Sequence, residues 1–168
     1  MPPSIHNVGL HAINETSAAL NYTPGFLAFH FIFAYGLLSS RTLKQYYGID
    51  HNVSPRYDLK DFGEEAVRTG KITRRQLEML KRNESASANA VENYTLLAGA
   101  LCLANIAGVN RSTINTAGLT YTAARIAYAA IYILVDHPWW SQMRGITWWI
   151  GNGSCLFLLW RSWQKLNS

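Results

Sequence analysis

The chain has 168 residues, a length that suits one domain, and a formal net charge of +5. Hydrophobic residues make up 49% of it and charged residues 15%, whereas about 25% of a soluble domain is charged on average. Most of the charge lies between Arg41 and Glu92, where acidic residues are interleaved with basic ones. This interleaving excludes a continuous basic stripe for nucleic acid.

The first apolar stretch predicts a membrane-spanning helix at about 20–40. No charged residue occurs between Glu15 and Arg41, and the run 25–38 is the apolar centre. A spanning helix needs about 20 mostly apolar residues, which this stretch supplies. The segment before it, Met1 to Tyr22, lacks the basic start and apolar stretch of a signal peptide. Insertion is therefore expected to depend on the helices of the chain itself.

The charged segment 41–72 is predicted to be a long loop. Pro55 forces an extended conformation on the residue before it and indicates a turn at 52–58. We expect Asp58 or Asp61 to cap a short helix that Gly70 then stops.

A second long helix is predicted at 73–109. Thr73 followed by Gln76 is a capping-box pattern, which typically opens a helix. The helix begins in charged sequence and carries no charge from Asn93 to Asn110, so its second half is expected to lie in the membrane.

Two further spanning helices are predicted at 112–135 and 142–163. Only Arg125 interrupts the first of them, and the second is uncharged between Arg144 and Arg161, with Trp near both ends as interfacial anchors. The sequence thus predicts an all-α fold, an integral membrane four-helix bundle forming a single domain over 1–168. The alternative is a soluble helical bundle in which the same runs are buried core helices.

The distribution of Lys and Arg predicts the orientation. Ten of them lie between residues 41 and 84 and none lies before residue 41. By the positive-inside rule, the long loop and the turn at 136–144 face the cytosol, with both termini across the membrane. The two cysteines, Cys102 and Cys155, stand in apolar runs, and we interpret them as core residues rather than as a disulfide or metal pair.

Polar residues recur every three or four positions on two of the predicted helices, and therefore share one face of each. On the helix at 73–109 they are Arg82, Ser85, Asn89 and Glu92. On the helix at 112–135 they are Tyr121, Arg125, Tyr128 and Tyr132. Polar residues at membrane depth tend to face a bundle interior or a cavity. We therefore expect the two faces to meet near the cytosolic side, beside Arg144.

Such a cluster suits a small, multiply charged ligand. Arginine binds carboxylates bidentately, a carboxylate binds an amine, and Tyr hydroxyls bind amides. The alternative is structural: an ion pair between Arg125 and Glu92 that only fixes helix packing, with Arg144 as a border residue reaching toward water.

The residues Arg82, Asn89 and Glu92 resemble the signature of the second helix in the MAPEG family (membrane-associated proteins in eicosanoid and glutathione metabolism). The stretch 124–149, ARIAYAAIYILVDHPWWSQMRGITWW, resembles the third and fourth helices of that family. The loop phrases NVSPRYDL and GKITRRQLEML are similar to fungal members. The family includes microsomal glutathione transferases, to which a relation is expected, leukotriene-C and prostaglandin-E synthases, and the non-enzymatic 5-lipoxygenase-activating protein.

The resemblance implies a homotrimer of four-helix bundles with glutathione between neighbouring subunits. Asn89 and Glu92 would contact the glutathione peptide, with Glu92 holding the γ-glutamyl amine. Positive charge and hydrogen bonds would come from the remaining matched positions, Arg82, Arg125, Tyr128 and Tyr132. Arg144 resembles the catalytic residue that stabilises the glutathione thiolate.

Three departures from the family pattern bear on glutathione binding. Ser85 stands where enzymes of the family often have a second arginine, and Gly145 where many have Ser. The connection from Tyr132 to Arg144 is longer than in the eicosanoid enzymes. Arg74 or Arg75 in the loop is a candidate replacement for the missing cation.

We therefore expect a glutathione-dependent enzyme of the endoplasmic reticulum membrane. Its substrate would be a lipophilic electrophile, epoxide or peroxide taken from the bilayer. One alternative is a non-catalytic lipid-binding or scaffold member, and another is a biosynthetic enzyme that reuses the pocket without glutathione. No metal and no nucleic acid is expected to take part.

Overall fold

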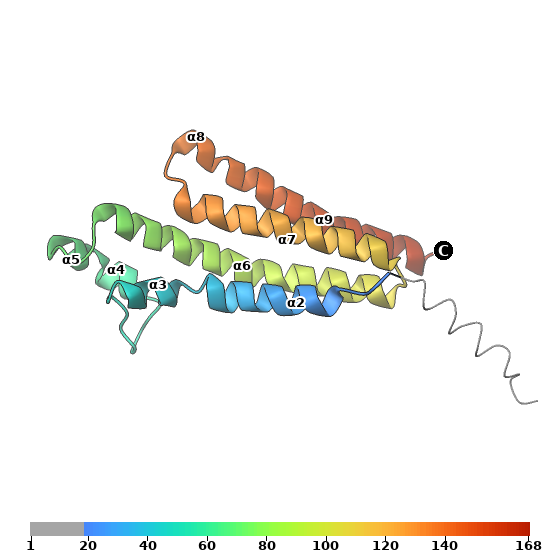
Figure 1. Cartoon of the computed structure of the whole chain (residues 1–168), viewed down its shortest axis with the longest axis horizontal. Coiled ribbons are helices and arrows are strands. Elements are labelled where there is room, and N and C mark those ends of the chain that lie inside the picture. Colours follow the sequence, from blue (N-terminus) through green and yellow to red (C-terminus); the bar gives the residue numbers. More distant parts are fainter. Residues whose placement is uncertain (1–18) are drawn as a thin grey trace, which may run out of the picture.

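The computed structural model describes residues 19–168, and all regular secondary structure in this part of the chain is helical (Figure 1). The all-α prediction is therefore confirmed for these residues. The expectation about a signal peptide concerns a segment that lies mostly outside the described residues. Four long helical segments run side by side: α2 (Thr23–Ile32) continued by the π-helical η1 (Phe33–Leu37), α6 (Arg74–Ile106), α7 (Arg111–Leu134) and α9 (Met143–Leu166).

Short helices occupy the connections at one end of these segments. α3 (Ser40–Tyr46), α4 (Asp58–Asp61) and α5 (Gly63–Arg68) lie between η1 and α6, and α8 (Pro138–Ser141) precedes α9. Figure 1 shows both groups at the same end, with the turn from α6 to α7 and the C-terminus at the opposite end. The two connections expected on one side of the membrane thus lie together.

The start of α6 is fixed by local hydrogen bonds. The Thr73 hydroxyl accepts from the Gln76 backbone N–H at 3.2 Å, and the Gln76 side chain accepts from the Thr73 N–H at 2.7 Å. The predicted capping box is confirmed. Arg74, the first residue of α6, donates to the Glu64 carboxylate at 2.7 Å, and this hydrogen bond holds the pKa of Glu64 below its ordinary value.

The expected capping of a loop helix by Asp58 or Asp61 is wrong. The N-cap residues of α4 and α5 are Tyr57 and Phe62, and neither makes a side-chain cap hydrogen bond. Asp58 instead turns inward: it is completely buried and its carboxylate lies 3.7 Å from the Lys44 ammonium. A buried ammonium requires a compensating charge, and this requirement outweighs the gain from an exposed helix cap.

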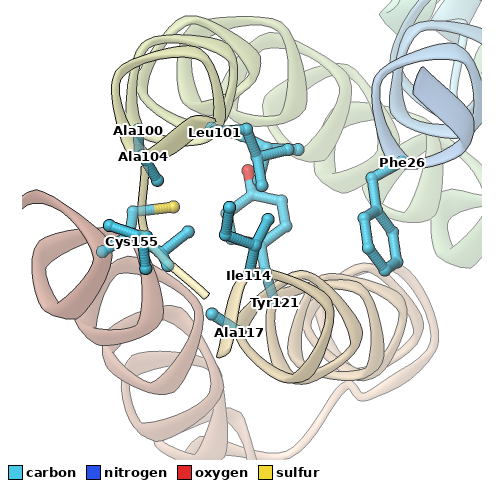
Figure 2. Close-up of a cluster of buried hydrophobic side chains, with 11 residues drawn as sticks. Phe26, Ala100, Leu101, Ala104, Ile114, Ala117, Tyr121 and Cys155 are labelled. Carbon is cyan, nitrogen blue, oxygen red and sulfur yellow. The ribbon is translucent and has the colours of Figure 1, made fainter. Parts of the chain in front are cut away.

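The core between the long helices is centred on Tyr121, which is 1% exposed. Figure 2 shows its ring between Leu101 of α6, Phe26 of α2 and Cys155 of α9. The Tyr121 hydroxyl donates to the Asn93 backbone oxygen of α6 at 3.1 Å, so the polar end of this buried ring is satisfied.

Of the two cysteines, only one is a core residue. Cys155 is buried, as expected, whereas Cys102 is exposed on α6. Leu101 and Ala104 take the inward positions of that turn. Adjacent residues of a helix point about 100° apart, so Cys102 faces outward although its sequence neighbours are apolar.

Two segments of the described chain, Thr23–Tyr46 and Arg111–Leu134, are long and apolar enough to cross a membrane. α6 and α9 do not reach the same hydropathy because Asn, Ser, Thr and Gly are frequent in them. α6 has 33 residues, which at 1.5 Å per residue makes it about 50 Å long. It therefore exceeds the hydrocarbon core of a bilayer, about 30 Å thick, and its first turns extend toward α3–α5.

Close contact between α2 and α7 depends on Gly118. A Cβ built there would overlap the Phe26 ring, so Gly118→Ala should lower the free energy of unfolding by about 1–3 kcal/mol through overpacking. Thermal unfolding in detergent measures this change. The matched control is Gly99→Ala in α6, where a Cβ meets nothing within 4 Å, and where stability should be unchanged or up to about 1 kcal/mol higher. Equal effects of the two substitutions would contradict the packing of α2 on α7.

Candidate functional site

Arg125 lies at the centre of the polar residues, enclosed by α6, α7 and α9. Its guanidinium donates to the Asn89 side-chain oxygen at 2.7 Å and to the Asn89 backbone oxygen at 3.3 Å. On the α9 side, a Cβ at Gly151 would lie 3.4 Å from the Arg125 side chain. Arg125 is 2% exposed, so it is sealed inside the structure. It joins α6 to α7 rather than facing open space.

The interior around Arg125 retains unused hydrogen-bonding capacity. Nη1 of Arg125 and the side-chain oxygen of Asn152 are buried and have no protein hydrogen-bond partner. Buried polar groups without partners are costly, and native proteins contain few of them. Each of these two side chains therefore keeps one buried polar atom without a hydrogen bond among the described residues.

A series of cations and aromatic rings runs from Arg125 along α7 to the start of α9. The Arg125 guanidinium lies 4.5 Å from the centroid of the Tyr128 ring, and the Tyr128 and Tyr132 rings are 5.4 Å apart. The Arg144 guanidinium lies 4.4 Å from the Tyr132 ring centroid and donates to the Ser141 backbone oxygen at 3.0 Å. Tyr128 is buried and Tyr132 half-buried, so the series opens outward toward Arg144.

Arg82 and Arg144 line one cavity of about 340 Å³ at the α8 end, together with Asp136 and His137. We call it the arginine cavity. Arg82 is anchored there, because it pairs with Asp136 at 3.1 Å and donates to the Ile133 backbone oxygen at 3.2 Å. The cavity therefore presents two guanidinium groups and one carboxylate.

Glu92 lies on a different flank of α6. It is exposed, and it lines a second cavity of about 440 Å³ formed with the segment between η1 and α6. We call this the Glu92 cavity; its other lining residues are Ser40, Arg56, Glu84, Ser87, Ala88 and Val91. Among the described residues Glu92 forms no ion pair with Arg125, so the packing ion pair considered as the structural alternative is not present.

The residues that share helix faces in the sequence, and were expected to form one cluster, thus lie in three separate places in the structure. Arg82 and Arg144 share the arginine cavity, Asn89 and Arg125 bond to each other in the interior, and Glu92 opens onto the other flank. Sequence reasoning missed Asp136 and Arg56. Neither has a periodic partner, because both lie in connecting segments whose contacts arise only on folding.

The candidate replacements for the cation missing at Ser85 lie elsewhere. Arg74 pairs with Glu64 of α5 at 2.7 Å. Arg75 lines a groove of about 340 Å³ with Arg82, Ile133 and other residues of α6 and α7. Ser85 itself is exposed and donates only to the Lys81 backbone oxygen, at 3.2 Å. Within the described residues, no group of three or more His, Cys, Asp or Glu side chains is placed to hold a metal ion.

The described chain is all-helical, contains two segments apolar enough to span a membrane, and carries a charged, tyrosine-containing cluster at one end of its packed helices. The MAPEG family model matches residues 21–163, and the chain belongs to the MAPEG family. Members of this family are integral membrane proteins and include glutathione-dependent enzymes. Comparison with curated proteins and with solved structures gives no match.

The bond between Arg125 and Asn89 should contribute strongly to stability. Asn89→Ala leaves a buried guanidinium without its principal acceptor, and should lower the free energy of unfolding by about 2–3 kcal/mol. Ser85→Ala, one turn earlier on the exposed side, should change it by less than about 0.5 kcal/mol. Asn89→Asp keeps an acceptor and should retain most of the stability. Detergent unfolding curves compare the three variants, and a tolerated Asn89→Ala would contradict the role of this bond.

Proposed function

We propose that the protein is a glutathione-dependent membrane enzyme of transferase, peroxidase or isomerase type, which acts on a lipophilic electrophile, epoxide or peroxide. The observation that carries the proposal is the arginine cavity, in which Arg82 and Arg144 lie together with Tyr132 beneath Arg144. Arg82, Tyr132 and Arg144 are among the residues for which the resemblance to the MAPEG family implies glutathione contacts, and the membership of the chain in that family supports the proposal.

The charges of the site fit the cofactor. Glutathione carries two carboxylates, one amine and one thiol, and therefore needs more cationic than anionic partners. Arg82 and Arg144 would bind anionic groups, and Glu92 would bind the amine. Tyr132, half-buried beside Arg144, and Tyr128 behind it would donate hydrogen bonds. Asn89 and Arg125 would not contact the ligand. Their hydrogen bond would hold α6 against α7 and so fix the positions of Arg82 and Glu92.

Arg144 is the catalytic residue of this proposal. Bound glutathione supplies a sulfur nucleophile, which reacts as the thiolate. A guanidinium near the sulfur favours the thiolate over the thiol, because an opposite charge within a few ångströms stabilises the ionised form. The Tyr132 ring and the Ser141 backbone oxygen hold Arg144 at the border of the helices, close to water and to the bilayer surface.

We further propose that the chain forms one membrane domain and that α2–η1, α6, α7 and α9 all cross the bilayer. α9 supports this despite its modest hydropathy: exposed Trp139 and Trp140 precede it, and exposed Trp160 and Trp163 lie near its end. About 20 helical residues separate the pairs, which corresponds to about 30 Å, the thickness of the hydrocarbon core. Trp at both boundaries is typical of a spanning helix. The α3–α5 end faces the cytosol, in the endoplasmic reticulum membrane.

The exposed carboxylate of Glu92 on α6 favours the assembly of several copies of the chain into an oligomer. The hydrocarbon region reaches back about 20 residues from the turn after α6, which places the exposed carboxylate of Glu92 within it. A lipid-facing carboxylate is expensive, so a ligand or another copy of the chain should cover it. We propose the homotrimer of the family, with glutathione between neighbouring subunits.

A non-catalytic lipid-binding or scaffold role is the second candidate. It is favoured by the Asn89–Arg125 bond, because two positions of the glutathione signature satisfy each other and are withdrawn from a ligand. Ser85 also stands where enzymes of the family often have a second arginine. A biosynthetic enzyme that reuses the pocket without glutathione would share these features.

Calorimetry of the detergent-solubilised protein with glutathione separates these functions. The unsubstituted protein should bind, and Glu92→Ala and Arg82→Ala should each weaken binding about tenfold or more, because each removes a hydrogen bond to a charged group. Lys81→Ala is the matched control: Lys81 neighbours Arg82 but is exposed and pairs with Glu78. Absence of binding at millimolar glutathione would rule out the proposal.

The catalytic assignment is tested by the ultraviolet absorbance of the bound thiolate as a function of pH. Arg144→Ala should raise the apparent pKa of the bound thiol by one unit or more, so the thiolate signal should appear only at higher pH. Arg144→Lys should give an intermediate shift because it keeps the charge without the planar guanidinium. A thiolate signal that is the same with and without the Arg144 side chain would remove Arg144 from the mechanism.

A further inference from the structure

The Glu92 cavity contains an opposite charge that does not come from a long helix. Arg56, from the connection between α3 and α4, lines the cavity opposite α6, which contributes Glu84 and Glu92. The cavity is about 440 Å³ in volume. It therefore presents one guanidinium and two carboxylates in a space large enough for an amino-acid-sized group.

Arg56 is presented by a tight turn. The Tyr57 N–H donates to the Ser54 backbone oxygen at 2.9 Å, which closes a four-residue turn with Pro55 and Arg56 at its centre. Pro is favoured at the first central position because its fixed backbone angle matches the turn. Arg56 follows at the second central position and is exposed.

A single buried ammonium holds this turn against α6. Lys44 donates to the Pro55 backbone oxygen, and its ammonium lies 3.7 Å from the Asp58 carboxylate and 3.5 Å from the Glu84 carboxylate. The Lys44 side chain is only 2% exposed. Lys44 thus contacts the chain on both sides of Arg56 and one lining residue of the cavity, and breaking such a buried cluster is costly.

We propose that Arg56 binds the α-carboxylate of the γ-glutamyl group in the Glu92 cavity, beside Glu92, to which the proposed function already assigns the α-amine. The inference rests on the proposed glutathione dependence. In the γ-glutamyl group the amine and the carboxylate share one carbon, so they need opposite charges within one cavity. Glu84 is already paired with Lys44, which leaves Glu92 for the amine. Arg56 then supplies the cation that Ser85 does not.

Lys44 is a positioning residue in this arrangement. It is buried away from the cavity surface and acts through Pro55, Asp58 and Glu84. Its contacts keep Arg56 over α6, so they determine whether the guanidinium and Glu92 reach one ligand group.

The test is a comparison of three ligands by calorimetry on the full-length protein: glutathione, an analogue lacking the γ-glutamyl α-carboxylate, and an analogue lacking its α-amine. Arg56→Met should weaken glutathione about 10- to 100-fold, the loss expected for a charged hydrogen-bonded pair. It should leave the analogue without the carboxylate unaffected. Glu92→Gln should likewise weaken glutathione binding, and it should leave binding of the analogue without the amine unaffected. Arg56→Lys should restore part of the loss.

Lys60→Met is the matched control, because Lys60 is an exposed cation of α4 that does not line the cavity. If Arg56→Met binds glutathione as tightly as Lys60→Met does, the inference is overturned while the proposed function stands. If Arg56→Met weakens all three ligands equally, the assignment to the α-carboxylate is overturned. If the unsubstituted protein binds no glutathione, the proposed function itself fails.

The positioning role of Lys44 has a separate readout. Lys44→Met combined with Asp58→Leu removes both buried charges, so neither is left alone. The double variant should discriminate about tenfold less than the unsubstituted protein between glutathione and the analogue lacking the carboxylate. Unchanged discrimination in a folded double variant would overturn the role of Lys44.

Discussion

The arrangement of the site depends on the need to satisfy a guanidinium inside packed helices. Arg125 is almost completely buried, and its principal acceptor is the side chain of Asn89. The bond fixes α6 against α7, and Gly151 of α9 lies against the Arg125 side chain. Because a rigid helix carries its side chains at set angles, fixing Asn89 also sets the directions of Arg82 and Glu92. A buried charge thereby orients groups that it does not touch.

The consequence is a site with two chemically different parts. The arginine cavity offers two guanidinium groups beside the Tyr132 ring, which suits anionic groups and a thiolate. The Glu92 cavity offers charges of both signs, which suits a zwitterionic group. The proposed ligand has this distribution of chemistry, since its zwitterionic γ-glutamyl end and its thiol belong to different residues of one tripeptide.

The connection between η1 and α6 has more structure than a flexible loop. Its own apolar cluster includes Ile49, Leu59 and Ile72, which pack against Leu77 and Leu80 of α6. Lys44 adds a buried charge cluster to this packing. The segment can therefore hold a side chain such as Arg56 in place over α6, as a ligand-binding residue requires.

Elements that depend on local chemistry can be predicted from the amino-acid sequence. The capping box at Thr73, the helical character of the long apolar runs and the membership of the MAPEG family follow from residue types at fixed spacings. Which polar groups meet depends on how the helices pack, and this does not follow from residue spacing. Spacing placed Glu92 on the same broad face as Asn89, but in the packed helices Asn89 is the partner of Arg125 and Glu92 lies on the flank. Lys44 and Asp58 were likewise unpredictable, because the energy of a buried ion pair depends on burial and on partners distant in the sequence.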